Sequence, residues 1–332
     1  MEKYSPRERI EMIIAGEKPD RYAASFWRHF FHRENSAQGT ADAMLDFQKE
    51  FKWDFMKINP RADFHIEDYG FTHKFSTDEF TKHTKTNFPI KTIQDWKNIK
   101  EIDIRSKSLD EHLRIVSLIR KGSDRELPIL MTIFSPIAVA GRMVSDRSIM
   151  VEHLNEEPEI VYEAVCNIAK TFEKYITELR NAGADGIFYA TTQWATTNLI
   201  NWEQYQKFGL PFDLRLLNAS GSDAINVFHI CSSNNYLTKI MEYDFNAQII
   251  NWETDDPTNM PLDIGLEKYK NKVILGGVDH TGWLLRSDAD EVGYMIQEIK
   301  EKTDSSRFIF GPGCAVDPKV SYENYHAIRK NL

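Results

Sequence analysis

Eight short β-rich runs alternate with segments of helical periodicity along almost the whole chain. The runs cover residues 22–26, 54–58, 129–134, 186–191, 225–230, 247–252, 272–278 and 307–311. Helical patterns at residues 39–51, 109–121, 147–182, 202–219, 262–270, 288–302 and 319–330 separate most of them. Strands that alternate with helices form parallel βαβ units, and eight such units predict a closed (β/α)8 barrel. A doubly wound open sheet is the alternative arrangement of the same elements.

The chain contains no low-complexity linker and no repeat other than this alternation, so we expect residues 1–332 to form a single domain. Residues 59–108 are long for a connection between a strand and the next helix, and they are rich in Asp, His, Lys and aromatic residues. We expect this segment to be an insertion that folds over the mouth of the barrel as a lid or rim.

Candidate ligand and acid–base residues follow the ends of four predicted strands. His229 and Cys231 end the fifth run, Glu253 follows the sixth, Asp279 follows the seventh and Cys314 follows the eighth. Active sites of (β/α)8 barrels lie at the carboxyl ends of the strands, so these residues should converge on one mouth. Side chains two residues apart on a strand point to the same face, so His229 and Cys231 should share one wall.

One imidazole and two thiols match the ligands that zinc prefers, and three protein ligands leave a fourth position for water or substrate. The H-x-C pattern is weak by itself, because a histidine at a strand end is often structural and a cysteine there is often only small and buried. The Gly311–Gly313 turn allows a close backbone approach before Cys314. We therefore predict a zinc site formed by His229, Cys231 and Cys314.

Zinc held by two thiolates and a neutral imidazole has a net charge near zero, which makes it a weak Lewis acid. It still deprotonates a thiol that binds to it. Alkyl transfer to sulfur suits such a centre better than hydrolysis of a carbonyl or phosphate. We expect Glu253, Asp279 or Gln193 to fill the fourth position at rest, and the two carboxylates to be catalytic.

Two arginines are candidates for binding anionic substrate groups. Arg28 follows the first run together with His29, His32 and Arg33, although an amphipathic helix with a solvated basic face explains this stretch as well. Arg142 is either an anion contact or part of a surface salt bridge.

Polar and aromatic residues on two other runs are further candidates. Asp54, Lys57 and Asn59 lie along the second run, where they either face substrate inside the barrel or form an internal ion pair. Tyr189, at the end of the fourth run, belongs either to an aromatic wall of the site or to the packed core. We take Asp54, Asn59 and Tyr189 as candidate substrate contacts, together with Gln193.

Charge and composition exclude several classes of protein. The formal net charge is -9 and there is no long basic block, so binding to a nucleic-acid backbone is not expected. The charged N-terminus lacks the apolar core of a signal peptide, and prolines interrupt the short apolar stretch at 127–141. Three scattered cysteines do not make a disulfide scaffold. We expect a cytoplasmic protein without a membrane partner.

The segment "RERIEMIIAGEKPDRYAASFW" resembles the opening of the uroporphyrinogen decarboxylase superfamily. The stretches "SPIAVAGRM", "NAGADGIFYA", "FHIC", "GGVD" and "FGPGCAVDP" follow in the same order as in that superfamily, so the resemblance covers nearly the whole chain. It implies a (β/α)8 barrel and, by analogy, a homodimer.

Two branches of this superfamily differ in their chemistry. The decarboxylase branch acts on uroporphyrinogen without a metal and grips its carboxylates with an Arg-Gln-Ala-Gly-Arg-type motif. That motif is missing here, and Gly313-Cys314-Ala315 replaces the Gly-His-Gly-type turn of that branch. The other branch contains the corrinoid-dependent methyltransferases that move methyl from methylcobamide to coenzyme M. Their zinc motif is similar to H-x-C with a distant cysteine, which His229, Cys231 and Cys314 match.

The leading hypothesis is a zinc-dependent methyltransferase that moves a methyl group from a methylcorrinoid to a zinc-activated thiol. No corrinoid-carrier motif is visible in the chain, so the corrinoid is expected on a separate carrier protein. The second hypothesis is a decarboxylase of a porphyrinogen or another polycarboxylate that uses Arg28, Arg142 and Asp54. The third is a non-catalytic barrel that binds a corrinoid or another small ligand.

Overall fold

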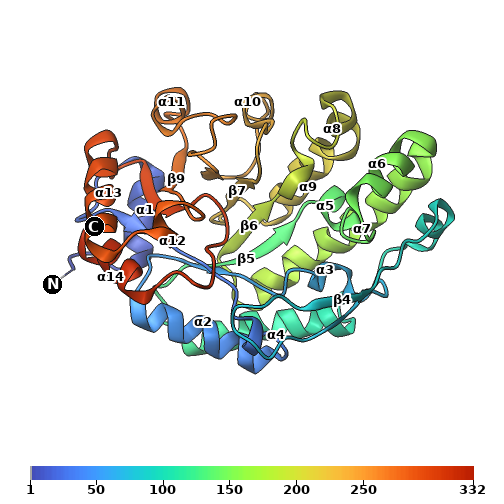
Figure 1. Cartoon of the computed structure of the whole chain (residues 1–332), viewed down its shortest axis with the longest axis horizontal. Helices are drawn as coiled ribbons and strands as arrows, with labels where there is room; N and C mark the ends of the chain where they lie inside the picture. Colours follow the sequence, from blue (N-terminus) through green and yellow to red (C-terminus); the bar gives the residue numbers. More distant parts are fainter. Residues whose placement is uncertain (1) are drawn as a thin grey trace.

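Eight parallel strands form the centre of the computed structural model, which describes residues 2–332 (Figure 1). The strands are β1 (Ala23–Ala24), β2 (Met56–Ile58), β5 (Ile129–Phe134), β6 (Gly186–Ala190), β7 (Val227–Ile230), β8 (Ile249–Trp252), β9 (Val273–Val278) and β10 (Phe308–Pro312). Their order in the sheet is β1-β10-β9-β8-β7-β6-β5-β2. The Asp54 N–H donates to the Ala24 carbonyl at 2.9 Å and the Ser25 hydroxyl donates to the Phe55 carbonyl at 2.9 Å, which joins β1 to β2 and closes the barrel.

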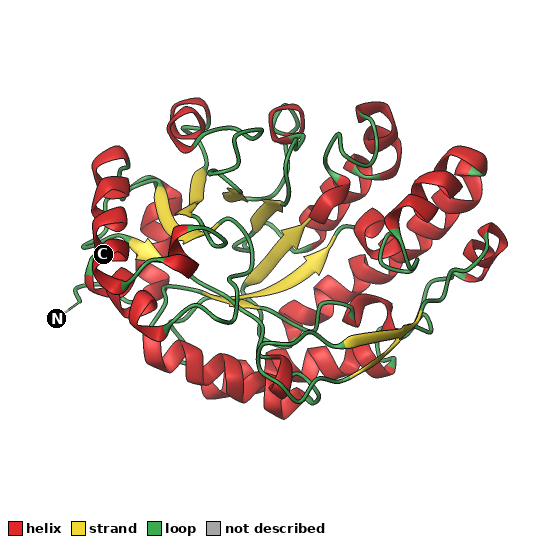
Figure 2. Cartoon of the chain, viewed as in Figure 1, coloured by secondary structure: helices red, strands yellow, loops and turns green. Residues whose placement is uncertain are grey.

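Helices surround the strands on the outside of the barrel (Figure 2). They are α1 (Pro6–Ala15), α2 (Ala37–Phe51), α3 (Phe64–Glu67), α4 (Lys107–Gly122), α5 (Pro136–Ala140), α6 (Arg147–Glu156), α7 (Pro158–Asn181), α8 (Trp202–Phe208), α9 (Leu210–Ala219), α10 (Leu237–Ile240), α11 (Leu262–Lys268), α12 (Trp283–Arg286), α13 (Ala289–Lys302) and α14 (Tyr322–Lys330). Three short 3-10 helices are η1 (Phe31–Arg33), η2 (Ile93–Asn98) and η3 (Thr192–Trp194). The predicted (β/α)8 architecture is confirmed, and the open-sheet alternative is wrong. Within residues 2–332, no helix combines the length and the apolar composition needed to cross a bilayer.

Two of the predicted helices are each two helices in the structure. Residues 147–182 form α6 and α7, because Pro158 lacks the N–H that would continue α6 and instead occupies the first position of α7. Residues 202–219 form α8 and α9, which meet at Gly209. The apolar periodicity continues across both junctions, so periodicity alone does not reveal them.

The strand side chains alternate between two hydrophobic layers. Outward-facing residues pack against the helices and include Met56, Ile58, Met131, Ile187, Phe228, Ile250, Ile274 and Phe310. Inward-facing residues fill the barrel and include Phe55, Leu130, Phe188, Val227, Ile249, Leu275 and Ile309. The same alternation turns Lys57 and Asn59 inward on β2, because they share the parity of Phe55.

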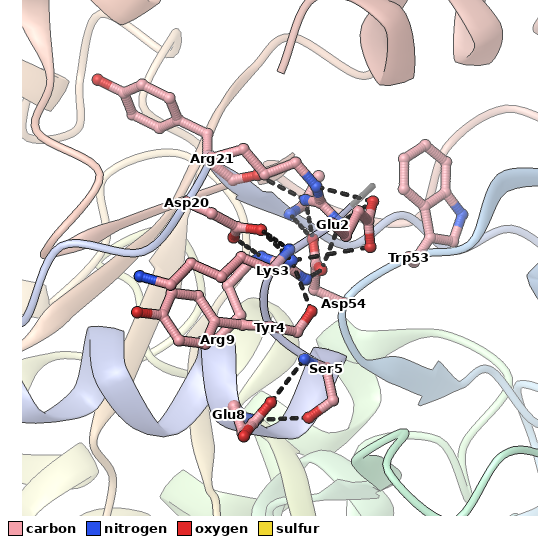
Figure 3. Close-up of polar contacts among 12 residues, drawn as sticks. Glu2, Lys3, Tyr4, Ser5, Glu8, Arg9, Asp20, Arg21, Trp53 and Asp54 are labelled. Carbon is pink, nitrogen blue, oxygen red and sulfur yellow. Dashed lines mark hydrogen bonds and ion pairs between the residues drawn. The ribbon is translucent and has the colours of Figure 1, made fainter.

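A buried ion network closes the amino-terminal end of the barrel (Figure 3). Arg9 on α1 donates to Asp54 at 2.7 Å and to Asp20 at 2.8 Å, and Arg21 donates to the second oxygen of Asp54 at 2.8 Å. Asp54 precedes β2, so it lies at the end of the barrel opposite to the predicted site. The expectation that Asp54 binds substrate or pairs with Lys57 is corrected by these contacts, because arginines occupy both of its carboxylate oxygens.

Residues 59–108 contain the antiparallel hairpin of β3 (Thr72–Lys74) and β4 (Thr84–Asn87). This hairpin was not predicted. Its Glu79 pairs with Arg28, and the Nε2 atom of its His83 lies 3.4 Å from Oε2 of Glu34. Arg28 and Glu34 belong to the loop that follows β1, so the hairpin stands beside the carboxyl-terminal mouth of the barrel. Its role as a lid stays a prediction.

Candidate metal centre

His229, Cys231 and Cys314 lie together at the carboxyl ends of two strands. His229 belongs to β7, Cys231 directly follows it, and Cys314 follows β10. Each residue offers one ligand atom within 4.8 Å of the other two, and the Sγ atoms of Cys231 and Cys314 are 3.6 Å apart. Strands β8 and β9 separate β7 from β10 in the sheet, so the curvature of the barrel brings the three residues together.

The separation of the two sulfur atoms fits one tetrahedral zinc ion. Two thiolates on the same ion, each with a Zn–S distance of about 2.3 Å, lie roughly 3.8 Å apart. The observed 3.6 Å is close to this value and far longer than a disulfide bond of about 2.05 Å. All three cysteines of the chain are free thiols. The donor set therefore suits zinc in both chemistry and spacing.

Asn251 on β8 fixes the orientation of His229. Its amide nitrogen donates to the carbonyls of Leu275 at 2.7 Å and Pro312 at 3.1 Å, so its Oδ1 atom faces Nδ1 of His229 at 2.6 Å. An acceptor at this position requires a proton on Nδ1 and leaves Nε2 free to bind a metal ion. Asn251 was not among the predicted residues. The sequence did contain a clue to its role. Asn251 is a polar residue inside the apolar run "AQIINW", and it lies two residues before Glu253, so both side chains point to the same face of the strand.

Glu253 brings a carboxylate to the two thiols. Its Oε1 atom lies 3.7 Å from the sulfur of Cys231 and accepts a hydrogen bond from the Ser232 N–H at 3.3 Å. A Cβ atom at Gly313 would lie 3.0 Å from the Cα and Cγ atoms of Glu253, so this close approach favours a glycine. The carboxylate is thus close enough to serve as a fourth ligand.

His280, rather than Asp279, lies among the donor atoms after β9. Ligand atoms of Glu253, His280 and Cys314 lie within 4.8 Å of one another. The Oδ1 atom of Asp279 instead accepts hydrogen bonds from the N–H groups of Thr281 at 3.1 Å and Gly282 at 2.7 Å, where it shapes the turn before α12. Both residues follow the same strand, but only His280 lies among the donor atoms.

The two thiols differ in acidity. A hydrogen bond from Cys231 lowers the pKa of Cys314 well below its usual value, and His229 and His280 add to the effect. The pKa of Cys231 is raised because its proton bonds to Cys314, and because burial and Glu253 disfavour a second negative charge. The pair thus favours a single thiolate, and a bound cation would release the second proton.

Both predicted arginines are already paired at the mouth. Arg28 is buried and pairs with Glu79, and Nη1 of Arg142 lies 2.9 Å from Oδ1 of Asp63. Because Asp54 lies at the opposite end, the three residues of the decarboxylase hypothesis do not form one group.

The other predicted substrate contacts are divided between the mouth and the core. Asn59 follows β2 and Gln193 follows β6, at the same end of the barrel as the predicted metal ligands. Tyr189 faces the helix layer instead, where its hydroxyl donates to the buried Asp213 at 2.7 Å. Tyr205 also donates to Asp213. The position of Tyr189 therefore corresponds to the core alternative and not to a wall of the site.

Asp213 should make stability depend on pH. Burial raises the pKa of Asp213 to about 7, although the hydroxyls of Tyr189 and Tyr205 oppose the rise. Between the unfolded pKa, near the usual value of 3.8, and pH 7, the folded protein therefore holds one proton more than the unfolded chain. The contribution of Asp213 to the free energy of unfolding is therefore fully present below the unfolded pKa of 3.8. It decreases by roughly 1.4 kcal/mol for each pH unit as the pH rises toward the folded pKa of about 7.

We expect Asp213→Asn to remove this slope, because the amide does not ionise. Urea unfolding of wild type and variant from pH 4 to pH 7.5 measures the difference. The exposed Asp223 provides a control, and Asp223→Asn should follow the wild type. Parallel pH profiles for wild type and Asp213→Asn would contradict the prediction.

The fold and the site define a class, the (β/α)8 barrels that carry a thiol and imidazole cluster at the carboxyl ends of their strands. A model of the uroporphyrinogen decarboxylase (URO-D) family matches residues 7–331. The chain therefore belongs to the uroporphyrinogen decarboxylase family.

Curated relatives include methylcobamide:CoM methyltransferases of Methanosarcina species. MtbA of Methanosarcina acetivorans is 22% identical over 230 residues, which cover 68% of this chain and 64% of that protein. MtaA of Methanosarcina barkeri is 22% identical over 217 residues, which cover 65% of this chain and 61% of that protein. The matched region thus spans less than two thirds of the length of either relative.

The barrel is also similar to solved structures. A methyltransferase from Methanosarcina mazei superposes with a TM-score of 0.81 at 16% identity, covering 99% of this chain and 98% of that chain. A B12-independent methionine synthase from Shewanella sp. W3-18-1 has a TM-score of 0.57 at 14% identity, covering 93% and 96% of the two chains. At these identities the similarity shows the fold.

Proposed function

We propose that this protein transfers a methyl group from a methylcorrinoid to a thiol held at a zinc ion bound by His229, Cys231 and Cys314. The observation that carries the proposal is the pair of sulfur atoms 3.6 Å apart beside an imidazole whose Nε2 is free. The named activity of the methylcobamide:CoM methyltransferase relatives supports the choice of methyl donor and of a thiol as acceptor.

Each residue of the site has a defined task in this reaction. When bound, zinc supplies the positive charge that keeps an acceptor thiol deprotonated near neutral pH. Asn251 holds His229 in the tautomer that binds metal. Oε1 of Glu253 lies beside the sulfur of Cys231, where it would serve as a fourth ligand and would accept the proton of an incoming thiol. The acceptor thiolate would form an S–CH3 bond as the Co–CH3 bond of the methylcorrinoid breaks, with the electron pair of that bond staying on the corrinoid, and the product would be a thioether.

We also propose that the corrinoid arrives on a separate carrier protein. The proposed metal ligands lie at the carboxyl ends of β7 and β10, whereas α1 and the Arg9–Asp54 network cover the other end of the barrel. A carrier would therefore approach this mouth, next to the β3–β4 hairpin.

Incubation of the zinc-loaded protein with methylcobalamin and small thiols tests the proposal. We expect the methylcobalamin absorbance to fall and the matching methyl thioether to appear by mass spectrometry. Cys231→Ser should abolish thioether formation, because it removes a ligand. A protein that retains one zinc and gives no thioether with any thiol offered would contradict the proposal and favour a non-catalytic barrel.

A further inference from the structure

Lys57 carries a buried amine for which residues 2–332 provide no anionic partner. It faces the interior from β2 with 5% of its surface exposed, and its ammonium lies 5.1 Å and 4.7 Å from the ring centroids of Trp27 and Phe188. Its side chain makes one hydrogen bond, to Oδ1 of Asn59 at 2.6 Å. Within residues 2–332, no carboxylate forms an ion pair with it. Buried ammonium groups are normally paired, because removing their charge from water costs several kcal/mol.

Asn59 leaves a second donor unused at the same place. The residue is 5% exposed, its amide oxygen is taken by Lys57, and its Nδ2 atom is buried without an acceptor among the described residues. A buried donor without a partner is itself destabilising. Two neighbouring groups therefore lack the same kind of partner, an anion with several acceptor oxygens such as a carboxylate or a sulfonate.

An aromatic wall connects this pair with the metal ligands. The rings of Trp27 and Phe188 are 5.0 Å apart, and the ring of Phe188 lies 5.3 Å from that of His229. Burial lowers the pKa of Lys57 to about 7, and the charge of Cys314 opposes this shift. Phe188 thus lies beside both Lys57 and the candidate ligand His229.

We propose that Lys57 and Asn59 form an oxyanion-binding subsite that receives the negatively charged head group of the acceptor thiol. Lys57 supplies the charge and two N–H donors, Asn59 supplies its free amide N–H groups, and Trp27 and Phe188 exclude water. The pair is thus a specificity determinant that distinguishes charged from neutral thiols. The assignment of a thiol rests on the proposed function, whereas the assignment of an oxyanion rests on the unpaired donors.

Binding measurements on charged and neutral thiols test this subsite. The probes are 3-mercaptopropionate and 2-mercaptoethanesulfonate, with 3-mercapto-1-propanol and 2-mercaptoethanol as their neutral counterparts. For the zinc-loaded wild type, calorimetry should show the charged thiols binding roughly 10- to 100-fold more tightly, as expected for hydrogen bonds to a charged group. The anion that binds more tightly shows whether the subsite prefers a carboxylate or a sulfonate.

In Lys57→Met we expect charged and neutral thiols to bind equally, with the zinc content unchanged. The unfolding temperature should stay equal or rise, because methionine fills the aromatic cradle without an unpaired charge. Lys272→Met is the matched control, since Lys272 lies half-buried before β9, where its Nζ donates to the Ala247 carbonyl at 2.7 Å. This control should keep the preference for charged thiols.

Two results would overturn the inference: equal affinity of the wild type for charged and neutral thiols, or an unchanged preference in Lys57→Met. Propionate and ethanesulfonate, which lack sulfur, separate this failure from failure of the proposed function. If the thiol chemistry is wrong but the subsite exists, the charged thiols bind no more tightly than these analogues. The affinity for the analogues should then still fall in Lys57→Met.

Discussion

Cys314→Ala is expected to lose its zinc, whereas the wild type purified without added metal should contain about one zinc ion per chain. The substitution removes one of three ligands and leaves a histidine and a single thiol from one strand end. Metal analysis by mass spectrometry gives the result directly. Cys166→Ala is the matched control, because Cys166 lies on α7 and packs against the helix layer. It should keep the full metal content.

A graded effect is expected from Asn251→Leu. This substitution leaves all three ligands in place but removes the acceptor that keeps Nδ1 of His229 protonated, so zinc affinity should fall by roughly 10- to 100-fold. Competition with a chelator measures the change. A metal-free wild type, or zinc retained by Cys314→Ala, would refute the metal centre itself.

Asp54→Ala is expected to lower the free energy of unfolding by about 3–5 kcal/mol, the cost of leaving a buried charge without its partner. Asp54 accepts hydrogen bonds from Arg9, Arg21 and the Ala24 N–H, and the Arg9 side chain is fully buried. Urea unfolding monitored by circular dichroism measures the loss. Zinc content should not change, because the network lies at the opposite end of the barrel.

Two comparisons make this prediction specific. The double variant Arg9→Met with Asp54→Leu should recover much of the lost stability, since apolar residues of similar volume replace a buried ion pair well. Glu163→Ala breaks an exposed pair with Lys100, and it should change stability little. A stable Asp54→Ala protein with altered thiol or metal binding would instead return Asp54 to the functional site.

The sequence predicted that the candidate ligands lie at the ends of strands on one side of the barrel. His229 and Cys231 are two residues apart on an apolar run, so their common face followed from strand geometry, and the barrel model placed Cys314 at the same mouth. The contact between Cys231 and Cys314 depends on the curvature of four adjacent strands, which no local pattern encodes.

Parity explains where the expectations for β2 went wrong. Asp54 and Lys57 are three residues apart, so they point to opposite faces of a strand and do not pair. Lys57 and Asn59, two residues apart, share the interior. Asn251 was missed for another reason, because its value lies in facing His229 across the β7–β8 register, and that register is a tertiary feature. Tyr189 could not be placed from the sequence for a similar reason. Whether it lines the site or packs in the core depends only on which face of the strand points into the barrel.

The predicted ligands Cys231 and Cys314, which follow β7 and β10, are synthesised at different times as well as on different strands. Cys314 is synthesised 83 residues after Cys231, which at about 5–20 residues per second corresponds to roughly 4–17 s of translation. During that interval the nascent chain offers only two of the three proposed ligands, and the three strands β8, β9 and β10 are synthesised before the third is made. If the zinc proposal is correct, binding by all three ligands is therefore a late event in the biogenesis of the protein.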